Sequence, residues 1–158
     1  MGNMELPFQR LIDIVLESIS FLPKPILIQG KNINLETIPG DVTVVDIMNF
    51  TDFNRTIESS NVVISHAGVG VIMQTLKSGK RPLVIPRRAI HKEHINDHQL
   101  DLVKYLENSG GLVYSFSSKS ELYDILKRKS LVYDSAFDFP LFNNEKIIQD
   151  IRQYLSTL

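Results

Sequence analysis

Short apolar runs that alternate with helix-like segments limit the fold of this chain more than any other feature. Five runs rich in aliphatic and β-branched residues recur along it, at 26–29, 42–45, 61–65, 82–86 and 112–114. Nearly unbroken apolar runs of this length are typical of strands buried on both faces of a parallel sheet. Because helix-like segments separate the runs, the sequence predicts an α/β fold with a doubly wound parallel sheet.

Helical periodicity and helix boundary signals predict the remaining elements. The expected helices span about 7–20, 51–59, 70–78, 96–108, 117–127 and 143–155. Thr51 or Asp52 caps the second helix, and Leu100, Val103 and Leu106 form the apolar face of the fourth. No internal repeat or linker interrupts this pattern, so we expect a single domain over residues 1–158.

Composition removes several classes of function. Lys plus Arg number 17 and Asp plus Glu number 18, so the net charge of −1 gives no whole-molecule attraction to nucleic acid or to acidic membranes. The absence of cysteine excludes disulfides, thiolate metal sites and cysteine nucleophiles. No apolar run reaches the length of a membrane span, and no signal peptide begins the chain. We therefore expect a cytoplasmic protein that contacts the membrane only through a partner.

The most informative loop is the turn from Ser65 to Gly70. In a doubly wound fold, ligands bind at the carboxyl ends of the strands, where this turn lies. Its two glycines let a ligand approach the backbone, and the free amides at the following helix start favour an anion such as a diphosphate. The alternative is a tight turn that needs glycine only for its geometry. His66 similarly has two interpretations, as a ligand contact or as a hydrogen-bonded structural residue.

A second polar loop, residues 87–99, follows the fourth apolar run. Its arginines are suited to phosphate, while Asn96, Asp97 and Gln99 offer hydrogen bonds to a sugar. The loop has two other interpretations. One is a solvated loop in which Asn96 or Asp97 caps the next helix. The other is a metal site that uses the three histidines at 3- and 4-residue spacing, His91, His94 and His98.

Taken together, these loops resemble the donor-binding half of family 28 glycosyltransferases. The resemblance covers residues 2–115 and is carried by His66–Gly70, Gln74, Gly79–Pro86 and Asn96–Gln99, in that order. It is strongest toward small subunits of split enzymes. These include the PssE-like subunits of capsule and exopolysaccharide synthesis and the catalytic subunit of the split UDP-GlcNAc transferase of N-glycan assembly.

This resemblance implies a Rossmann-like C-terminal half of a GT-B enzyme that transfers a hexose from a UDP-sugar with inversion. A membrane-anchored partner subunit would supply the acceptor half and a lipid-linked acceptor, and would recruit the chain to the inner face of the membrane. The UDP-sugar is then a substrate, with no separate cofactor or metal. Carried over position by position, the implied UDP-sugar-binding residues are Gly2, Asn3, His66, Ala67, Gly68, Val69, Gly70, Gln74, Arg87, Asn96, Asp97, His98 and Gln99.

Two departures from the family pattern stand out. Gln74 occupies the position where the related peptidoglycan transferase has a ribose-binding glutamate, so the charge is lost although the hydrogen-bonding capacity stays. The family's first strand precedes a turn that Gly2–Asn3 resembles, and here only Met1 precedes it. The central first strand is therefore missing from this sequence, and its loss would leave unpaired backbone and an apolar gap. Three explanations are open: a start site assigned too late, which we favour, replacement of the strand by other chain, or a degenerate subunit.

Two rival functions remain at this point. The first is a non-catalytic accessory subunit that stabilises or activates an acceptor-binding partner. The second is a nicotinamide-dependent oxidoreductase, in which the arginines of the second loop would accept a 2′-phosphate. Met73 stands where a dinucleotide fingerprint needs its third glycine, which argues against the second.

Overall fold

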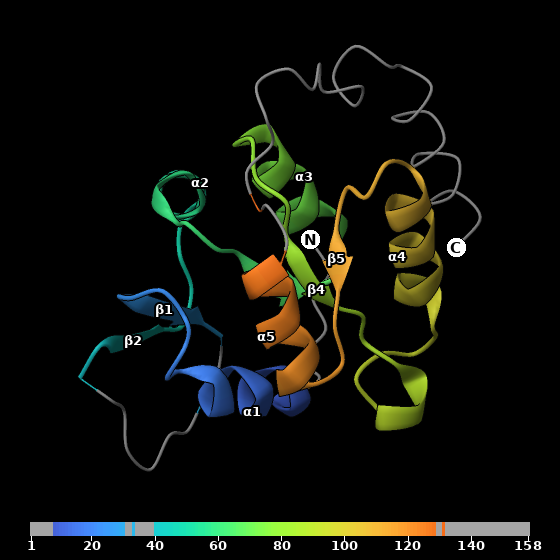
Figure 1. Ribbon diagram of the computed structural model, residues 1–158, viewed down its shortest axis with the longest axis horizontal. Coiled ribbons are helices and arrows are strands. Elements are labelled where there is room, and N and C mark those ends of the chain that lie inside the picture. The colour runs from blue at the N-terminus through green and yellow to red at the C-terminus, as the bar shows by residue number, and fades with distance from the viewer. Residues whose placement is uncertain (1–7, 31–32, 34–39, 129–130, 132–158) are drawn as a thin grey trace.

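The computed structural model describes residues 8–30, 33, 40–128 and 131. Helices and strands alternate along most of this stretch (Figure 1). In chain order they are α1 (Gln9–Ser18), β1 (Ile26–Gln29), β2 (Val42–Val45), α2 (Phe50–Ser59), β3 (Ile64–His66), α3 (Val69–Lys77), β4 (Leu83–Ile85), the 3₁₀ helix η1 (Ala89–His91), α4 (His98–Asn108), β5 (Tyr114–Ser115) and α5 (Lys119–Arg128). The predicted α/β architecture is confirmed. The helix predicted over 143–155 lies outside the described residues.

All strand pairs are parallel, but they form two sheets rather than one. Strands β1 and β2 pair in register from Ile26 opposite Val42 to Gln29 opposite Val45. Strands β3, β4 and β5 form the second sheet in that order. Among the described residues no ladder joins β1 or β2 to the sheet of β3, β4 and β5. A divided sheet of this kind is consistent with the sequence-based expectation of a missing central strand.

Strand β4 is the centre of the three-stranded sheet and is buried on both faces, as its apolar run predicts. Val84 belongs to a cluster with residues of α3 and α4, whereas Leu83 and Ile85 belong to a second cluster with residues of α1, α5, β1 and β2. Helices α3 and α4 therefore cover one face of this sheet. Helices α1 and α5 pack together over the other face (Figure 1).

Several element boundaries differ from the sequence-based expectation. Asn49, rather than Thr51 or Asp52, caps α2, because its side-chain oxygen accepts the Asp52 amide at 2.9 Å. Strands β3 and β5 begin three and two residues later than predicted. The η1 turn lies inside the segment predicted as a loop. None of these shifts moves His66 or Arg87 away from the end of its strand.

The apolar face of α4 also differs in part. Val103 and Leu106 are buried as predicted, but Gln99 and Leu102 complete the buried stripe, and Leu100 lies half-buried on its flank. The helix ends where predicted, since Gly110 and Gly111 both take positive φ, the left-handed conformation that glycine adopts without strain. Within the described part of the chain, no helix is long and apolar enough to cross a membrane.

Candidate functional site

The register of β3 and β4 brings the two polar loops of the sequence together. His66, the last residue of β3, lies directly opposite Ile85, the last residue of β4. The turn that follows β3 therefore starts beside Pro86 and Arg87, the residues that follow β4. Both loops emerge at the carboxyl edge of the sheet, which is where ligands bind in open parallel α/β folds.

The turn into α3 exposes a helix start with no side-chain cap. The Gly68 amide donates to the His66 carbonyl at 2.8 Å, and the first helical hydrogen bond runs from the Ile72 amide to the Gly68 carbonyl at 3.1 Å. Gly68 is the N-cap residue and supplies no cap hydrogen bond. The amides of residues 69–71 precede that first bond, so they have no acceptor within the helix. They form, with the positive end of the helix dipole, a ready place for an anion.

The two glycines of this turn have different steric reasons. A Cβ at Gly68 would lie 2.4 Å from Nε2 of His66, so the imidazole ring occupies the space that a side chain there would need. A Cβ at Gly70 would meet nothing within 4 Å, and Gly70 is exposed on the first turn of α3. The space above Gly70 is therefore open, while the space above Gly68 is taken by His66.

His66 is held in its neutral form. Burial lowers its pKa to about 4, and the positive charges of Arg87 and His94 add to the effect. At neutral pH the ring therefore carries one N–H donor and one acceptor nitrogen rather than a charge. An imidazole in this state hydrogen-bonds an oxygen ligand without adding a cation.

Arg87 is anchored by its backbone and leaves part of its guanidinium without a partner. Its amide donates to Oε1 of Gln99 at 2.9 Å, and its guanidinium carbon lies 5.2 Å from the centre of the Phe8 ring. Burial lowers its pKa, against the opposing charge of Glu93. Its Nε is buried and has no hydrogen-bond partner among the described residues. A buried cationic donor of this kind is suited to a phosphate oxygen.

The four residues predicted to meet the donor sugar are not equally available. Asn96 and Asp97 are exposed. Asp97 stands at the N-cap position of α4, but its carboxylate accepts the Ala89 amide at 2.8 Å and makes no cap bond. The ring of His98 contacts the Asn96 side chain. Gln99 is only 5% exposed, and its oxygen is used to hold Arg87. Gln99 therefore acts in this structure by positioning Arg87.

A buried ion pair that the sequence did not reveal fixes the loop between β4 and α4. Glu93 accepts from Nε and Nη2 of Arg10 at 3.0 and 2.8 Å, and from the Arg88 amide at 3.0 Å. Burial raises the pKa of Glu93, but the hydrogen bonds from Arg10 and Arg88 outweigh it and hold the pKa below its usual range. Because Arg10 is 83 residues away, the only local signal is one acidic residue inside a basic run.

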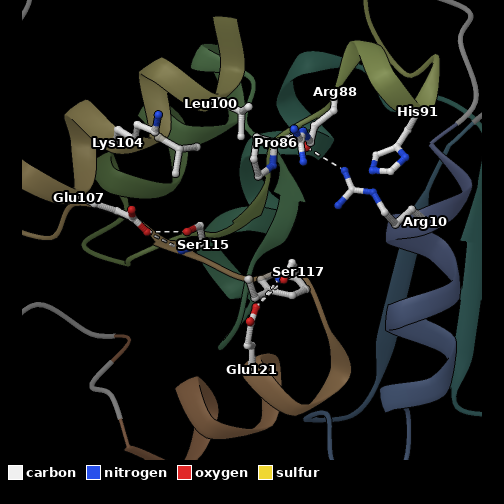
Figure 2. A pocket seen from close by; sticks show the side chains of 12 residues that line it. Arg10, Pro86, Arg88, His91, Leu100, Lys104, Glu107, Ser115, Ser117 and Glu121 are labelled. Atoms are coloured by element: carbon white, nitrogen blue, oxygen red, sulfur yellow. Dashed lines mark hydrogen bonds between the residues drawn. The ribbon is translucent and has the colours of Figure 1, made fainter. Parts of the chain in front are cut away.

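A cavity of about 460 Å³ opens beside this loop, at the carboxyl ends of β4 and β5 (Figure 2). In Figure 2 the Arg10 side chain reaches the carbonyl of Pro86, with Nη2 at 2.9 Å. The lining residues are Arg10, Pro86, Arg88, His91, Leu100, Val103, Lys104, Glu107, Ser115, Phe116, Ser117 and Glu121. None of the UDP-sugar-binding residues implied by the resemblance is among these lining residues, although the cavity adjoins Arg87 and Gln99 through their chain neighbours. Two other candidates of the second polar loop, Arg88 and His91, do line it.

The remaining predicted residues are placed as follows. Ala67 is buried, Val69 packs against the core from the first turn of α3, and Gln74 lies half-buried in the same helix. Gly2 and Asn3 lie outside the described residues. In the described part of the chain no three His, Cys, Asp or Glu side chains form a group able to hold a metal, so the metal interpretation of the three histidines gains no support there.

Comparison with known proteins extends this picture. Over 71 residues the chain is 39% identical to the UDP-N-acetylglucosamine transferase subunit ALG13 of Homo sapiens, a match that covers 44% of this chain and 6% of that protein. The subunit of the same name from Cryptococcus neoformans is 39% identical over 70 residues, covering 42% of this chain and 33% of its own length. The chain thus matches a third or less of the length of these two relatives.

A solved structure resembles the whole fold. The glycosyltransferase SnogD from Streptomyces nogalater aligns with 99% of this chain and 37% of its own, with a TM-score of 0.51 and 16% sequence identity. This likeness shows a shared fold with one part of that glycosyltransferase. Residues 6–128 match the glycosyltransferase family 28 C-terminal domain. Because that match spans well over half of the sequence, the chain belongs to glycosyltransferase family 28.

Proposed function

We propose that this chain binds a UDP-sugar and serves as the donor-binding subunit of a split inverting glycosyltransferase in polysaccharide biosynthesis. One observation carries the proposal. The uncapped start of α3 and the buried, unpartnered Nε of half-buried Arg87 lie at the carboxyl ends of two adjacent strands. Backbone amides and an arginine that converge from two strand ends suit a diphosphate, whose oxygens need several donors at once.

The proposed reaction assigns the chain a defined share of the chemistry. An acceptor hydroxyl attacks the anomeric carbon, a new C–O bond forms there, and the bond from that carbon to the diphosphate oxygen breaks. Negative charge then develops on the leaving UDP, where the α3 amides and Arg87 stabilise it. The acceptor proton passes to a base that we expect on the partner half. Neutral His66 adds a hydrogen bond at the edge of the diphosphate site.

The partner is also part of the proposal. The curated relatives that match this chain are called subunits of a UDP-N-acetylglucosamine transferase, which supports a UDP-sugar donor and a second subunit. We propose that a membrane-anchored subunit supplies the lipid-linked acceptor and holds this cytoplasmic chain at the inner face of the membrane.

Calorimetric titration of UDP, with a nicotinamide dinucleotide as control ligand, tests the donor site. We expect UDP binding without dinucleotide binding. Gly70→Asp should abolish UDP binding, because the space above Gly70 is open and a carboxylate there would meet the diphosphate, while an acidic residue in the first turn keeps α3 intact. Gly40→Asp is the matched control, since Gly40 is also exposed and a Cβ there also meets nothing within 4 Å. Unchanged UDP affinity in Gly70→Asp would refute the placement.

The same titration separates the accessory alternative. A folded wild-type chain that binds a partner subunit but not UDP would favour a non-catalytic role, which the loss of charge at Gln74 makes worth testing. In the opposite case, Gln74→Glu should tighten UDP binding by about fivefold, because hydrogen bonds to a charged group are about 1 kcal/mol stronger than neutral ones. Equal UDP affinity in wild type and Gln74→Glu would show that this side chain does not reach the ribose.

A further inference from the structure

The loop between β4 and α4 is held in a fixed shape at its base. The Glu93 carboxylate ties it to Arg10 of α1, and the Ala89 amide is bound by Asp97 at 2.8 Å. The Glu93 amide also donates back to the Arg88 carbonyl at 3.2 Å. Lys92 adopts a left-handed conformation, with φ of 56°, that side chains other than glycine rarely take. These contacts pre-set the outer part of the loop.

Two large aliphatic side chains stand out from this fixed loop. Ile90 is 73% exposed and Ile95 is 78% exposed. Figure 1 shows the loop, in yellow-green, extending below α4 at the rim of the molecule. Because these contacts fix the loop, it cannot fold back onto the domain to bury the two isoleucine side chains. Exposed isoleucines that are held outward are therefore available to an apolar surface outside the chain.

The side chains around the two isoleucines are basic. Arg88, His91, Lys92 and His94 come from the same stretch, and His91 and Lys92 are exposed. The acidic residue among them, Glu93, is 4% exposed and points inward to Arg10. The other acidic residue, Asp97, is exposed, and its carboxylate accepts the Ala89 amide at the base of the loop. The outer part of the loop therefore presents aliphatic side chains beside exposed Lys92 and half-buried Arg88, although the whole chain is nearly neutral.

We propose that the β4–α4 loop binds directly to the surface of an anionic lipid bilayer, with Ile90 and Ile95 entering the interface and the flanking cations meeting the headgroup phosphates. Aliphatic side chains flanked by Lys and Arg are the pattern of interfacial membrane segments. The proposal does not depend on UDP binding. It gives the chain a membrane contact of its own, in place of the sequence-based expectation that every such contact runs through a partner.

A second exposed apolar site on the chain has the opposite surroundings. Ile47 and Phe50 are 67% and 76% exposed after β2, and their exposed charged neighbours are Asp46 and Asp52. An anionic bilayer repels such a site. Protein interfaces, in contrast, are depleted of lysine. The loop carrying Lys92 therefore fits a lipid surface better than a protein partner, and Phe50 provides a control of equal exposure.

Vesicle flotation tests the proposal with the full chain. Vesicles of phosphatidylcholine, with and without phosphatidylglycerol, are mixed with wild type, Ile90→Ser/Ile95→Ser, Lys92→Gln and Phe50→Ser. We expect wild type to bind the anionic vesicles alone. The double variant should lose about tenfold or more in vesicle affinity, because burying one isoleucine is worth more than a factor of ten. Lys92→Gln should lose less affinity than the double variant. Phe50→Ser should bind as wild type does. Half-molar salt should weaken wild-type binding.

A fluorescence measurement reports insertion site by site. The chain has no tryptophan, so Ile90→Trp and Phe50→Trp each carry a single tryptophan, which can be excited selectively over the tyrosines. Emission from Ile90→Trp should shift to the blue on addition of anionic vesicles and be quenched by brominated lipid, while emission from Phe50→Trp should not change. Three outcomes would overturn the proposal. They are no wild-type flotation, equal losses in the double variant and Phe50→Ser, or an Ile90→Trp emission that a protein partner shifts and anionic vesicles leave unchanged. Failure here leaves the UDP titration unaffected.

Discussion

Acid should destabilise this protein through one histidine, and the size of the effect follows from its surroundings. Burial and the nearby charges of Arg87 and His94 lower the pKa of His66 from 6.5 to about 4 in the folded chain. Between pH 6.5 and 4, His66 is therefore mostly unprotonated in the folded state and mostly protonated in the unfolded chain. The stability that results is fully present above pH 6.5 and is lost as the pH falls from there toward 4.

The magnitude can be worked out for a chosen pair of pH values. Between pH 8 and pH 5 the unfolded imidazole becomes almost fully protonated, while the folded one stays mostly neutral. The linkage relation then gives a loss of about 2 kcal/mol in the free energy of unfolding from His66 alone. Carboxylates such as Glu93 also titrate, but mostly below this range. They are present in both wild type and a His66→Gln variant, so their contribution cancels in the comparison.

Urea denaturation followed by circular dichroism, at pH 8 and pH 5, measures the quantity directly. Wild type should lose about 2 kcal/mol more than His66→Gln between these two pH values. The comparison is between the pH-dependent changes in the free energy of unfolding of the two proteins. Any cost of the substitution that is the same at both pH values therefore cancels. Equal losses in the two proteins would refute the reasoning, since they would mean that folding leaves the pKa of His66 unchanged. An NMR titration of the His66 ring would then locate the error.

Further predictions concern the start of α3 and the ion pair between Arg10 and Glu93. Gly70→Ala should raise the free energy of unfolding by about 0.5–1 kcal/mol, because alanine favours the helix and meets open space. The same change should weaken UDP binding in calorimetry, whereas stabilisation with unchanged affinity would place the diphosphate elsewhere. Glu93→Gln should cost about 2 kcal/mol in urea denaturation, because it leaves half-buried Arg10 without a charged partner. Asp124→Asn, which breaks the exposed pair with Arg128, should cost under about 0.5 kcal/mol, and equal costs would contradict this account.

The fold was predictable from sequence because its signals are local. The run Leu83–Ile85 is apolar at every position, and the structure buries every position. Parallel pairing places the carboxyl ends of β3 and β4 at one edge of the sheet, so the loops that carry His66 and Arg87 were expected there. The register that sets His66 opposite Ile85 came from the structure. The α2 cap was missed because three neighbouring residues can all cap a helix, and only the backbone geometry selects Asn49.

The contacts that fix the β4–α4 loop were not predictable from the sequence, for a physical reason. A salt bridge between Arg10 and Glu93 joins residues 83 positions apart, and no local propensity encodes such a pair. Likewise, the sequence marked Gln99 as a polar ligand candidate but carried no sign that its oxygen would be used on the Arg87 backbone. Side chains that serve other residues in this way become visible only when the tertiary contacts are known.

The division of the sheet has a consequence for how the domain opens. Hydrogen-bond ladders transmit cooperativity along a sheet, and among the described strands no ladder joins β1–β2 to β3–β4–β5. The two blocks are held together by side-chain packing in one shared cluster. Native-state hydrogen exchange should therefore resolve two separate opening units, as it does where cooperative units meet without a common ladder. The amides of β1 and β2 should exchange through a smaller opening that leaves the protected ladder around β4 closed.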